Sequence, residues 1–250
     1  MDLILYEAKD HLARVTLNRA EKRNALNAEL IAACIEVLQR AADDDAVHVV
    51  LLSGAGKDFC AGMDLNAASA NPSTMDHLQT AQRIEQLLLA IRHHRCPVIA
   101  AVHGRALGGG AGIASACDMV VAAQSAWFGY PEVNMGFVPA MVAAFLRRHT
   151  GDKRAFEFLL SGTPISAQEA CAAGLINHVY PEDEFAAASE KFARGFAEKS
   201  ATALALTKAL LNHTDGMTLE KALQAGVQTN VIARGTPDAL RGIAGFAKKP

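Results

Sequence analysis

A glycine-rich turn between an apolar run and a stretch of small residues constrains the fold of this chain most strongly. The apolar run, Val98 to Val102, has the composition of a buried strand. The turn holds three adjacent glycines, Gly108, Gly109 and Gly110, and the small residues that follow can pack closely as a helix. The first turn of a helix leaves backbone N–H groups unpaired at the positive end of the helix dipole. This stretch can therefore hold a negatively charged oxygen without a charged side chain.

The glycine-rich turn has other possible interpretations, and the spacing of its glycines excludes two of them. The glycines could do no more than let the strand and the helix pack closely, and that alternative stays open. A dinucleotide-binding fingerprint needs glycines at its first, third and sixth positions, but the sixth residue counted from Gly108 is Ile113. A nucleophile elbow needs a glycine two residues before and after a serine, and Ser115 has neither.

Length and composition bound the architecture and the partners. The chain has 250 residues, of which 51% are hydrophobic, so it can form one large domain or a domain with an appendage. The formal net charge of −2 gives no general attraction to nucleic acid or to an anionic membrane, and we predict neither as a partner. No run of about 18 apolar residues occurs, so no membrane span is expected. The N-terminal segment lacks the basic and apolar regions of a secretory signal.

The cysteines indicate the cellular compartment. Five cysteines are scattered along the chain, mostly among apolar residues, and none forms a Cys-x-x-Cys pair. Reduced core thiols of a cytoplasmic protein show this distribution, whereas a metal site or a disulfide framework needs paired spacing. We therefore predict a cytoplasmic protein without a metal site.

Hydrophobic periodicity predicts an α/β core that extends to about residue 195, followed by a helical tail from residue 196 to residue 250. Asn27 and Ser166 are expected to cap two of the helices. Strands are expected at residues 3–6, 12–17, 49–52, 98–102, 119–122, 126–129 and 175–179. Helices are expected at residues 28–42, 77–93, 140–149, 153–160 and 167–173 and, with breaks, from Pro181 to the end.

Three segments could combine into one site. A second glycine-rich turn follows the strand at 49–52 and ends at Met63, and an oxyanion site usually needs two donors. The backbone N–H groups of Met63 and Gly109 are the candidates. Glu132 follows Pro131 and a mostly apolar stretch, where a carboxyl group with a raised pKa could carry a proton. A lone glutamate of this kind can equally be a solvated loop residue.

Several motifs in this chain occur in the order and spacing of a known family. They are Asn24-Ala-Leu-Asn27, Phe59-Cys-Ala-Gly-Met-Asp-Leu65, Ala106-Leu-Gly-Gly-Gly110, Cys117-Asp118, Pro131-Glu132 and the later segment from Ile165 to Val179. In these motifs the chain resembles the crotonase superfamily, the enoyl-CoA hydratase/isomerase family, over nearly its whole length.

The resemblance implies a fold and an assembly. Residues 1–195 would form a right-handed spiral of ββα units, and residues 196–250 a helical region used in trimerisation. The protein would be a homotrimer or a dimer of trimers. The tail agrees with this expectation, because residues such as Leu204, Leu206 and Leu210 give it more apolar surface than a solvated appendage should carry.

The resemblance also implies a substrate, an acyl-CoA thioester, with coenzyme A as part of that substrate and no separate cofactor. The thioester oxygen would lie between the N–H groups of Met63 and Gly109, and Glu132 would act on the acyl carbons. The adenine end would lie near Arg23, Ala25 and Ala61. Further substrate contacts fall to the matching positions Asp64, Leu65, Leu107 and Pro131.

One position departs from the pattern of the family. Hydratases of this family usually carry a second glutamate two residues after the glycine run, where this chain has Gly112. Hydration is helped by two carboxylates, whereas moving a double bond needs one base that takes a proton and returns it elsewhere. A single glutamate favours enoyl-CoA isomerisation. The alternatives are hydration of a 2-enoyl-CoA, a related acyl-CoA hydrolase or decarboxylase, and a non-catalytic acyl-CoA-binding protein. Asp64 is either a second acid or a residue that holds its turn.

Overall fold

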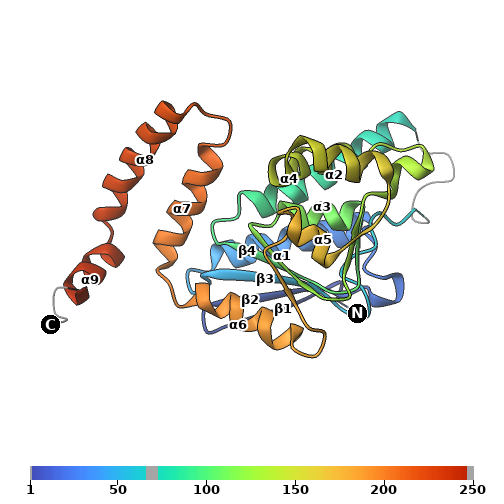
Figure 1. The fold of residues 1–250 in the computed structure, drawn as a ribbon. Coiled ribbons are helices and arrows are strands. Elements are labelled where there is room, and N and C mark those ends of the chain that lie inside the picture. The colour runs from blue at the N-terminus through green and yellow to red at the C-terminus, as the bar shows by residue number, and fades with distance from the viewer. Residues whose placement is uncertain (1, 66–72, 247–250) are drawn as a thin grey trace.

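A six-stranded sheet forms the centre of the computed structural model, which describes residues 2–65 and 73–246 (Figure 1). The strand order is β1-β2-β3-β4-β6-β9, in which only β1 and β2 pair antiparallel. The strands are β1 (Ile4–Lys9), β2 (Leu12–Leu17), β3 (Val49–Gly54), β4 (Val98–Val102), β6 (Met119–Ala123) and β9 (His178–Tyr180). The parallel pairing requires helical crossovers between the strands, which confirms the α/β class expected from the sequence.

A second, three-stranded sheet has the order β5-β7-β8 and consists of β5 (Arg105–Leu107), β7 (Trp127–Gly129) and β8 (Ile165–Ser166). Glycine at position 104, with φ of 55°, makes the sharp turn that carries the chain from β4 to β5. The next pair, β6 and β7, repeats the same passage from the large sheet to the small one. Each pair therefore contributes one strand to each sheet before the chain enters a helix or loop.

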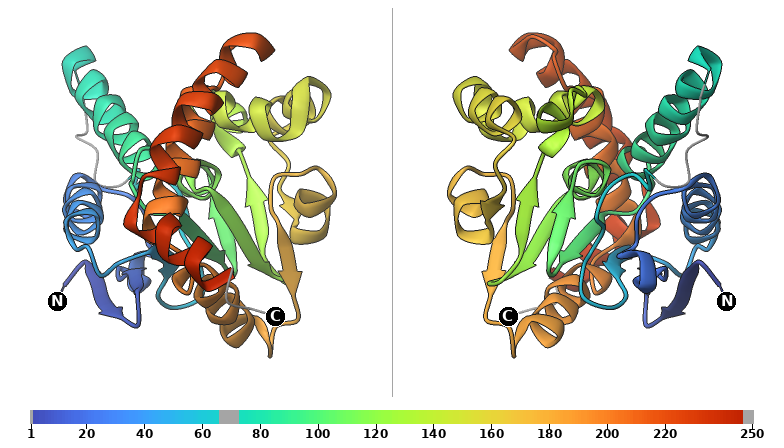
Figure 2. Two further views of the ribbon diagram at one scale, coloured as in Figure 1. Left: turned by 90° about the vertical axis from the view of Figure 1, so that its left-hand side faces the viewer. Right: turned by 90° about the vertical axis from the view of Figure 1, so that its right-hand side faces the viewer.

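Helices cover both faces of the large sheet. One face is covered by α1 (Ala28–Asp43), α2 (Thr74–Arg92), α3 (Gly109–Ala116), α4 (Ala140–Ser161) and α5 (Ala167–Ala172), and the other by α6 (Phe185–Ala197) (Figure 1). The last three helices, α7 (Ala201–His213), α8 (Leu219–Arg234) and α9 (Pro237–Phe246), form an arm at one end of the sheet (Figures 1 and 2). No helix in the described part of the chain is long and apolar enough to cross a membrane.

The strands are buried on both faces because each face has its own helical cover. In β3, Val50 and Leu52 join the large core beneath α1–α5, whereas Val49 and Leu51 join a smaller core against α6. All residues of β4 are buried. This two-sided burial is why parallel strands have continuous apolar sequences, and it explains why the strand at 98–102 is predicted with its observed bounds.

Differences from the expected elements have local causes. Helix α2 begins at Thr74 rather than at residue 77, because Ser73 and Asp76 form a capping box at its start. The break expected between helices 140–149 and 153–160 occurs at Gly151, whose φ of 72° and ψ of 170° are not helical. The last strand is β9, one to three residues later than the expected 175–179. The expected boundary after residue 195 falls in the last turn of α6.

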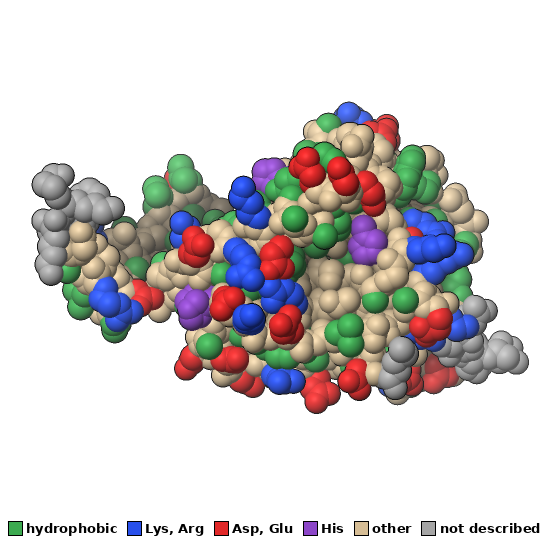
Figure 3. All heavy atoms as spheres, turned by 90° about the horizontal axis from the view of Figure 1, so that it is seen from below, with side chains coloured by type: hydrophobic (Ala, Val, Ile, Leu, Met, Phe, Trp, Pro, Cys, Tyr) green, Lys and Arg blue, Asp and Glu red, His purple; other side chains and the backbone are tan. Residues whose placement is uncertain are grey.

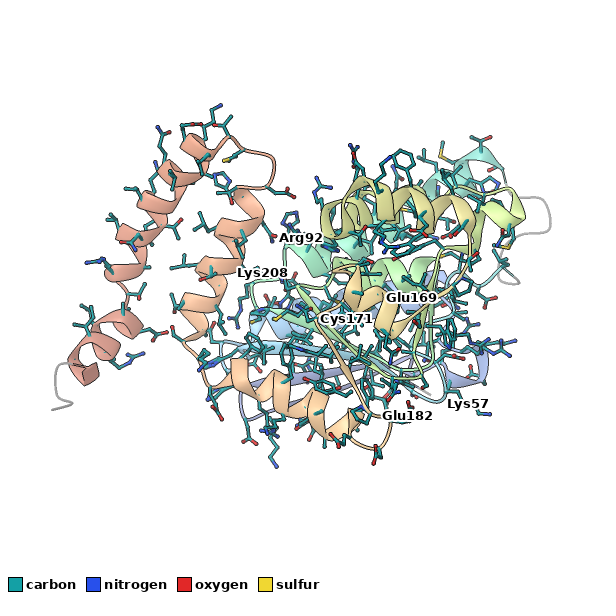
Figure 4. All side chains as sticks on the ribbon, in the orientation of Figure 1. Lys57, Arg92, Glu169, Cys171, Glu182 and Lys208 are labelled. Carbon is teal, nitrogen blue, oxygen red and sulfur yellow. The ribbon has the colours of Figure 1, made fainter. Side chains whose placement is uncertain are left out.

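A buried ion pair joins the arm to the core. The ammonium group of Lys208 in α7 donates to Asp118 at 2.6 Å and to the carbonyl oxygens of Ile91 and Cys96, both at 3.1 Å (Figure 4 shows Lys208 between α7 and the core). Asp118 in turn accepts the N–H of Val98 at 2.7 Å. Burial raises the pKa of Asp118 and lowers that of Lys208, and the attraction within the pair opposes both shifts.

Removal of the cation should destabilise the protein. We expect Lys208→Met to lower the free energy of unfolding by about 3–5 kcal/mol, because Asp118 then stays buried without its counter-charge. Urea denaturation at one fixed protein concentration measures this. As a control, Asp118→Asn in the Lys208→Met background removes the stranded charge and should recover part of the loss. Equal stability of the wild type and Lys208→Met would contradict a stabilising ion pair.

Candidate functional site

The first turn of the site lies between β5 and α3 and contains three successive glycines, of which Gly108 and Gly110 leave no room for another residue type. Gly108 has φ of 50° and donates its N–H to the carbonyl of Gly129 at 2.8 Å. A Cβ atom on Gly110 would lie 2.2 Å from the carbonyl oxygen of Cys60, and one on Gly109 would lie 3.0 Å from the side chain of Leu26. The glycine run therefore allows close backbone packing, and it also sets the start of α3 against the neighbouring turn.

The neighbouring turn follows β3 and pairs with β5 through its backbone. The N–H of Cys60 donates to the carbonyl of Arg105 at 3.0 Å, and the N–H of Leu107 donates to the carbonyl of Cys60 at 3.0 Å. Gly62 has φ of 95°, and a Cβ atom there would lie 3.7 Å from the backbone nitrogen of Gly109. The structure thus brings the two glycine-rich turns into direct contact.

Two backbone donors in this region have no acceptor among the described residues. Across residues 2–65 and 73–246, neither the N–H of Met63 nor the N–H of Gly109 donates a hydrogen bond. Gly109 is the first residue of α3, where N–H groups lack a partner within the helix. Met63 lies between Gly62, whose carbonyl accepts the N–H of Leu26 at 2.7 Å, and Asp64, whose N–H donates to Leu26 at 2.8 Å. These two free donors can bind an oxygen that gains negative charge.

Glu132 lies beside the start of α3. It belongs to a short 3-10 helix, η2 (Pro131–Met135), and its Oε1 atom is 3.1 Å from the position of a Cβ atom on Gly108. The side chain is half-buried, and its Oε2 atom is buried without a hydrogen-bond partner among the described residues. Burial raises the pKa of Glu132. A carboxyl group of this kind can accept and return a proton at neutral pH.

Tyr130 adds a second buried polar group to the same segment. The side chain is 1% exposed, and its hydroxyl finds no hydrogen-bond partner in the described residues. Burial raises the pKa of Tyr130, the nearby hydroxyl of Ser115 opposes this shift, and the negative charge of Glu132 adds to it. Local sequence patterns do not indicate the state of this hydroxyl, because it depends on the packing around Tyr130.

Asp64 forms an ion pair that the sequence did not reveal. The guanidinium of Arg19 donates to Asp64 at 2.7 Å and also to the carbonyl oxygen of Ala25 at 2.9 Å. Both charged side chains are largely buried. The pair connects the polar turn after β2 with the turn at Met63, which supports a turn-holding role for Asp64. The missed partner lies 45 residues away in the sequence, too far for local patterns to indicate.

The remaining predicted residues lie on the segments around these turns. The N–H of Ala61 donates to the carbonyl of Arg23 at 3.0 Å, which places the two expected adenine-binding segments side by side. Leu65 is 59% exposed, and Leu107 is half-buried at the end of β5. Pro131 opens the 3-10 helix that carries Glu132. Outside this cluster, the Nε2 of His103 donates to the carbonyl oxygen of Gly56 at 3.0 Å.

Clusters of metal-ligating side chains and the charge of the surface are two further features that bear on the chemistry of this site. In the described ranges no group of three or more His, Cys, Asp or Glu side chains could hold a metal ion. Acidic and basic side chains are intermixed on the face of the molecule that Figure 3 shows, so that face offers no single-sign patch for a polyanion.

Comparisons with known proteins decide the family. The sequence profile of the family named Enoyl-CoA hydratase/isomerase matches residues 7–250. The chain belongs to this family. A Thermus thermophilus protein provisionally named enoyl-CoA hydratase is 36% identical over 96% of both chains. The 2,3-dehydroadipyl-CoA hydratase of Escherichia coli is 33% identical over 100% of this chain and 97% of its own.

Solved structures of the family have the same fold. The crystal structure of an enoyl-CoA hydratase from Mycobacterium smegmatis matches with a TM-score of 0.96 at 32% identity, covering 99% of this chain and 97% of the other. Human enoyl Coenzyme A hydratase domain-containing protein 3 matches with a TM-score of 0.95 at 29% identity, covering 100% and 99%. The expected crotonase fold is therefore confirmed, and this enoyl-CoA hydratase/isomerase family member is an enzyme.

The raised pKa of Glu132 predicts a pH-dependent effect on stability. A carboxyl group whose pKa is higher in the folded protein than in the unfolded chain stabilises the fold only at low pH, and this contribution disappears as pH rises through the folded-state pKa. We therefore expect Glu132→Gln to raise the melting temperature at pH 8, with the two melting curves converging near pH 4. Calorimetric scans at fixed protein concentration test this. A variant less stable than the wild type at pH 8 would contradict the unfavourable burial of the carboxylate.

Proposed function

We propose that this enzyme isomerises the double bond of an enoyl-CoA thioester, with Glu132 as the single proton carrier. One observation carries the proposal. Glu132 has a raised pKa and, in the part of the chain that the structure describes, a carboxylate oxygen without a hydrogen-bond partner beside the start of α3, whereas Gly112 offers no second carboxylate there. A single base that takes and returns a proton is sufficient for isomerisation.

In the proposed mechanism the N–H groups of Met63 and Gly109 bind the thioester oxygen. When the base removes a proton from the neighbouring carbon, negative charge moves onto that oxygen. Two fixed backbone donors and the positive end of the α3 dipole stabilise this charge without reorganising. The loss of one such donor typically slows the reaction roughly 100- to 1,000-fold.

Glu132 carries the proton between two carbons. For a 3-enoyl-CoA, the carboxylate takes a proton from carbon 2, and the electrons of that C–H bond form an enolate conjugated with the double bond. The carboxylic acid then returns the proton to carbon 4, which leaves the double bond between carbons 2 and 3. No atom is gained or lost, and Glu132 ends in its initial state.

The segments around the turns complete the proposed substrate site. We assign the adenine end of coenzyme A to Arg23, Ala25 and Ala61, whose segments are joined by a backbone hydrogen bond. Leu65, Leu107 and Pro131 are the proposed contacts of the thioester and acyl region, and Asp64 holds its turn with Arg19. No cofactor besides the coenzyme A of the substrate enters the proposal. The free cysteines fit a cytoplasmic location.

Hydration of a 2-enoyl-CoA is the second candidate, because relatives such as the Escherichia coli protein carry hydratase names. Hydrolysis or decarboxylation of an acyl-CoA would use the same oxyanion site, and a non-catalytic binding protein is disfavoured by the unpaired carboxylate of Glu132. These reactions differ in product mass, which separates them directly.

Product analysis tests the proposed reaction. The purified protein is mixed with crotonyl-CoA and, separately, with a 3-enoyl-CoA. We expect the 3-enoyl-CoA to keep its mass and to gain a conjugated chromophore. We expect Glu132→Gln to lose about 100- to 10,000-fold in rate and to stop exchanging the carbon 2 proton with heavy water. A gain of one water on crotonyl-CoA at a much higher rate would favour the hydratase, and an unaffected Glu132→Gln enzyme would exclude Glu132 as the proton carrier.

The backbone donor at Gly109 can be removed selectively. Proline lacks an N–H but is favoured at the first position of a helix, which is where Gly109 lies in α3. We expect Gly109→Pro to lower kcat/KM roughly 100- to 1,000-fold or more. Gly109→Ala is the matched control, because it keeps the N–H. Its Cβ would lie 3.0 Å from the end of the Leu26 side chain, which must shift slightly, and 3.9–4.0 Å from the side chain of Met63. Full activity in a folded Gly109→Pro enzyme would rule out this donor.

We also propose that the arm assembles the protein into a homotrimer or a dimer of trimers. Helix α8 contacts α7 and α9, yet it exposes an apolar stripe of Leu219, Leu223, Val227 and Val231, each more than 60% exposed. A stripe of this size on a helix usually marks an interface. Light scattering should give three or six times the chain mass of 26.4 kDa, and a purely monomeric protein at working concentrations would refute the assembly.

A further inference from the structure

Two complementary oxygen atoms are buried on one short segment. They are the hydroxyl oxygen of Tyr130 and the Oε2 atom of Glu132, and neither has a hydrogen-bond partner within residues 2–65 and 73–246. A phenol can donate a hydrogen bond, and an ionised carboxylate can only accept one. Leaving both groups unpaired away from water opposes folding, so a hydrogen bond between them would satisfy two costly groups at once.

The segment that carries both residues is held against the start of α3. The carbonyl of Gly129 accepts the N–H of Gly108 at 2.8 Å. The Oε1 atom of Glu132 lies 3.1 Å from the position of a Cβ atom on Gly108, so this oxygen faces the glycine-rich turn. The other oxygen, Oε2, is enclosed by protein. Because the last torsion of a glutamate side chain is broad, Oε2 can turn toward a donor at little cost.

The hydroxyl of Tyr130 is influenced by two neighbouring side chains. Burial has the largest effect and raises the pKa of Tyr130, the hydroxyl of Ser115 in α3 lowers it, and the charge of Glu132 raises it. Ser115 is 3% exposed and Tyr130 is 1% exposed, so both hydroxyls belong to the interior. A serine that directs its proton at the phenol oxygen leaves the tyrosine O–H free to point at Glu132.

Glu132 needs such a donor if it is to act as a base. Burial raises its pKa, and the N–H of its own backbone opposes that shift. No charged side chain in the described ranges is among the causes. A base works in its ionised form, and a hydrogen bond donated to that form lowers the pKa of a carboxyl group. A donor at Oε2 would therefore keep the base active closer to neutral pH.

We propose that Tyr130 is a positioning residue for the proton carrier, because its hydroxyl donates to Oε2 of the ionised Glu132 and leaves Oε1 to take the proton from the substrate. This inference rests on the proposed function, in which Glu132 is the base. Tyr130 gives up no proton in the reaction and is too deeply buried to touch the substrate. Ser115 orients the phenol from the other side.

The pH dependence of kcat/KM for a 3-enoyl-CoA tests this role, since its acidic limb reports the ionisation of the base in the free enzyme. Tyr130→Phe removes only the hydroxyl. We expect the limb to move about one to two pH units higher, the usual effect of one hydrogen bond to a charged group. At alkaline pH, where Glu132 is ionised in both enzymes, the two rates should approach each other. An unmoved limb would overturn the inference.

Two further variants serve as controls for the tyrosine. The hydroxyl of Tyr6 is also buried without a partner in the described residues, but Tyr6 lies in β1 with the guanidinium of Arg40 over its ring at 4.4 Å. Tyr6→Phe removes the same atom and should leave the limb in place. Ser115→Ala should move the limb in the same direction as Tyr130→Phe, but less. Equal movement in Tyr6→Phe and Tyr130→Phe would indicate a general change of the fold and contradict the assignment.

A measurement without substrate distinguishes failure of this inference from failure of the proposed function. Carbon-13 NMR of protein labelled at the glutamate carboxyl carbons follows the ionisation of Glu132, whose signal is identified by its absence in Glu132→Gln. Its titration midpoint should move to higher pH in Tyr130→Phe and stay in place in Tyr6→Phe. If it moves although the enzyme isomerises no 3-enoyl-CoA, only the proposed reaction fails. If it does not move, Tyr130 does not position Glu132.

Discussion

The close packing of two turns against each other is the constraint on which the site depends. The turn after β3 and the turn before α3 share backbone hydrogen bonds at Cys60, and the carbonyl of Cys60 leaves no room for a side chain on Gly110. Because these contacts involve backbone atoms alone, they fix both turns without depending on side-chain rotamers. The free N–H groups of Met63 and Gly109 owe their relative placement to this packing.

The candidate site contains buried polar groups that have no hydrogen-bond partner among the described residues. In the rest of a folded protein such groups are normally paired. Tyr130 and Glu132, two residues apart on one segment, each present a buried oxygen that has no hydrogen-bond partner within residues 2–65 and 73–246. Unpaired buried groups oppose folding, so the rest of the molecule must stabilise this segment. The extensive two-sided burial of β3 and β4 provides that stability close to the site. The arrangement agrees with the general observation that functional regions are less stable than the framework around them.

Local sequence patterns predicted the parts of the fold that depend on local interactions. Asn27 caps α1 as expected, and Ser166 caps α5, because capping uses residues three positions apart. The three-residue β5 and the two-residue β8 were not predicted as strands, since such short segments are defined by partners far along the chain. The same reason hides the ion pairs of Arg19 with Asp64 and of Asp58 with Arg105. The candidate site was predictable mainly because its motifs resemble those of a family, whereas the unpaired state of Glu132 depends on packing.

The contacts of α7 with the core have a consequence for how the chain completes its folding. Lys208 donates to the carbonyl of Ile91, and Asn212 donates to the carbonyl of Arg92 at 2.7 Å, so two side chains of α7 satisfy the carbonyl groups that end α2. Lys208 follows its acceptor by 117 positions in the sequence, and Asn212 follows its acceptor by 120. The carbonyl groups of Leu89 and Ile91 also accept the N–H of His93, but the carbonyl of Arg92 obtains its hydrogen bond from a segment that a ribosome makes much later. The core and the arm are separate in shape, but a nascent chain that lacks α7 would still leave the last carbonyl of α2 without this hydrogen bond.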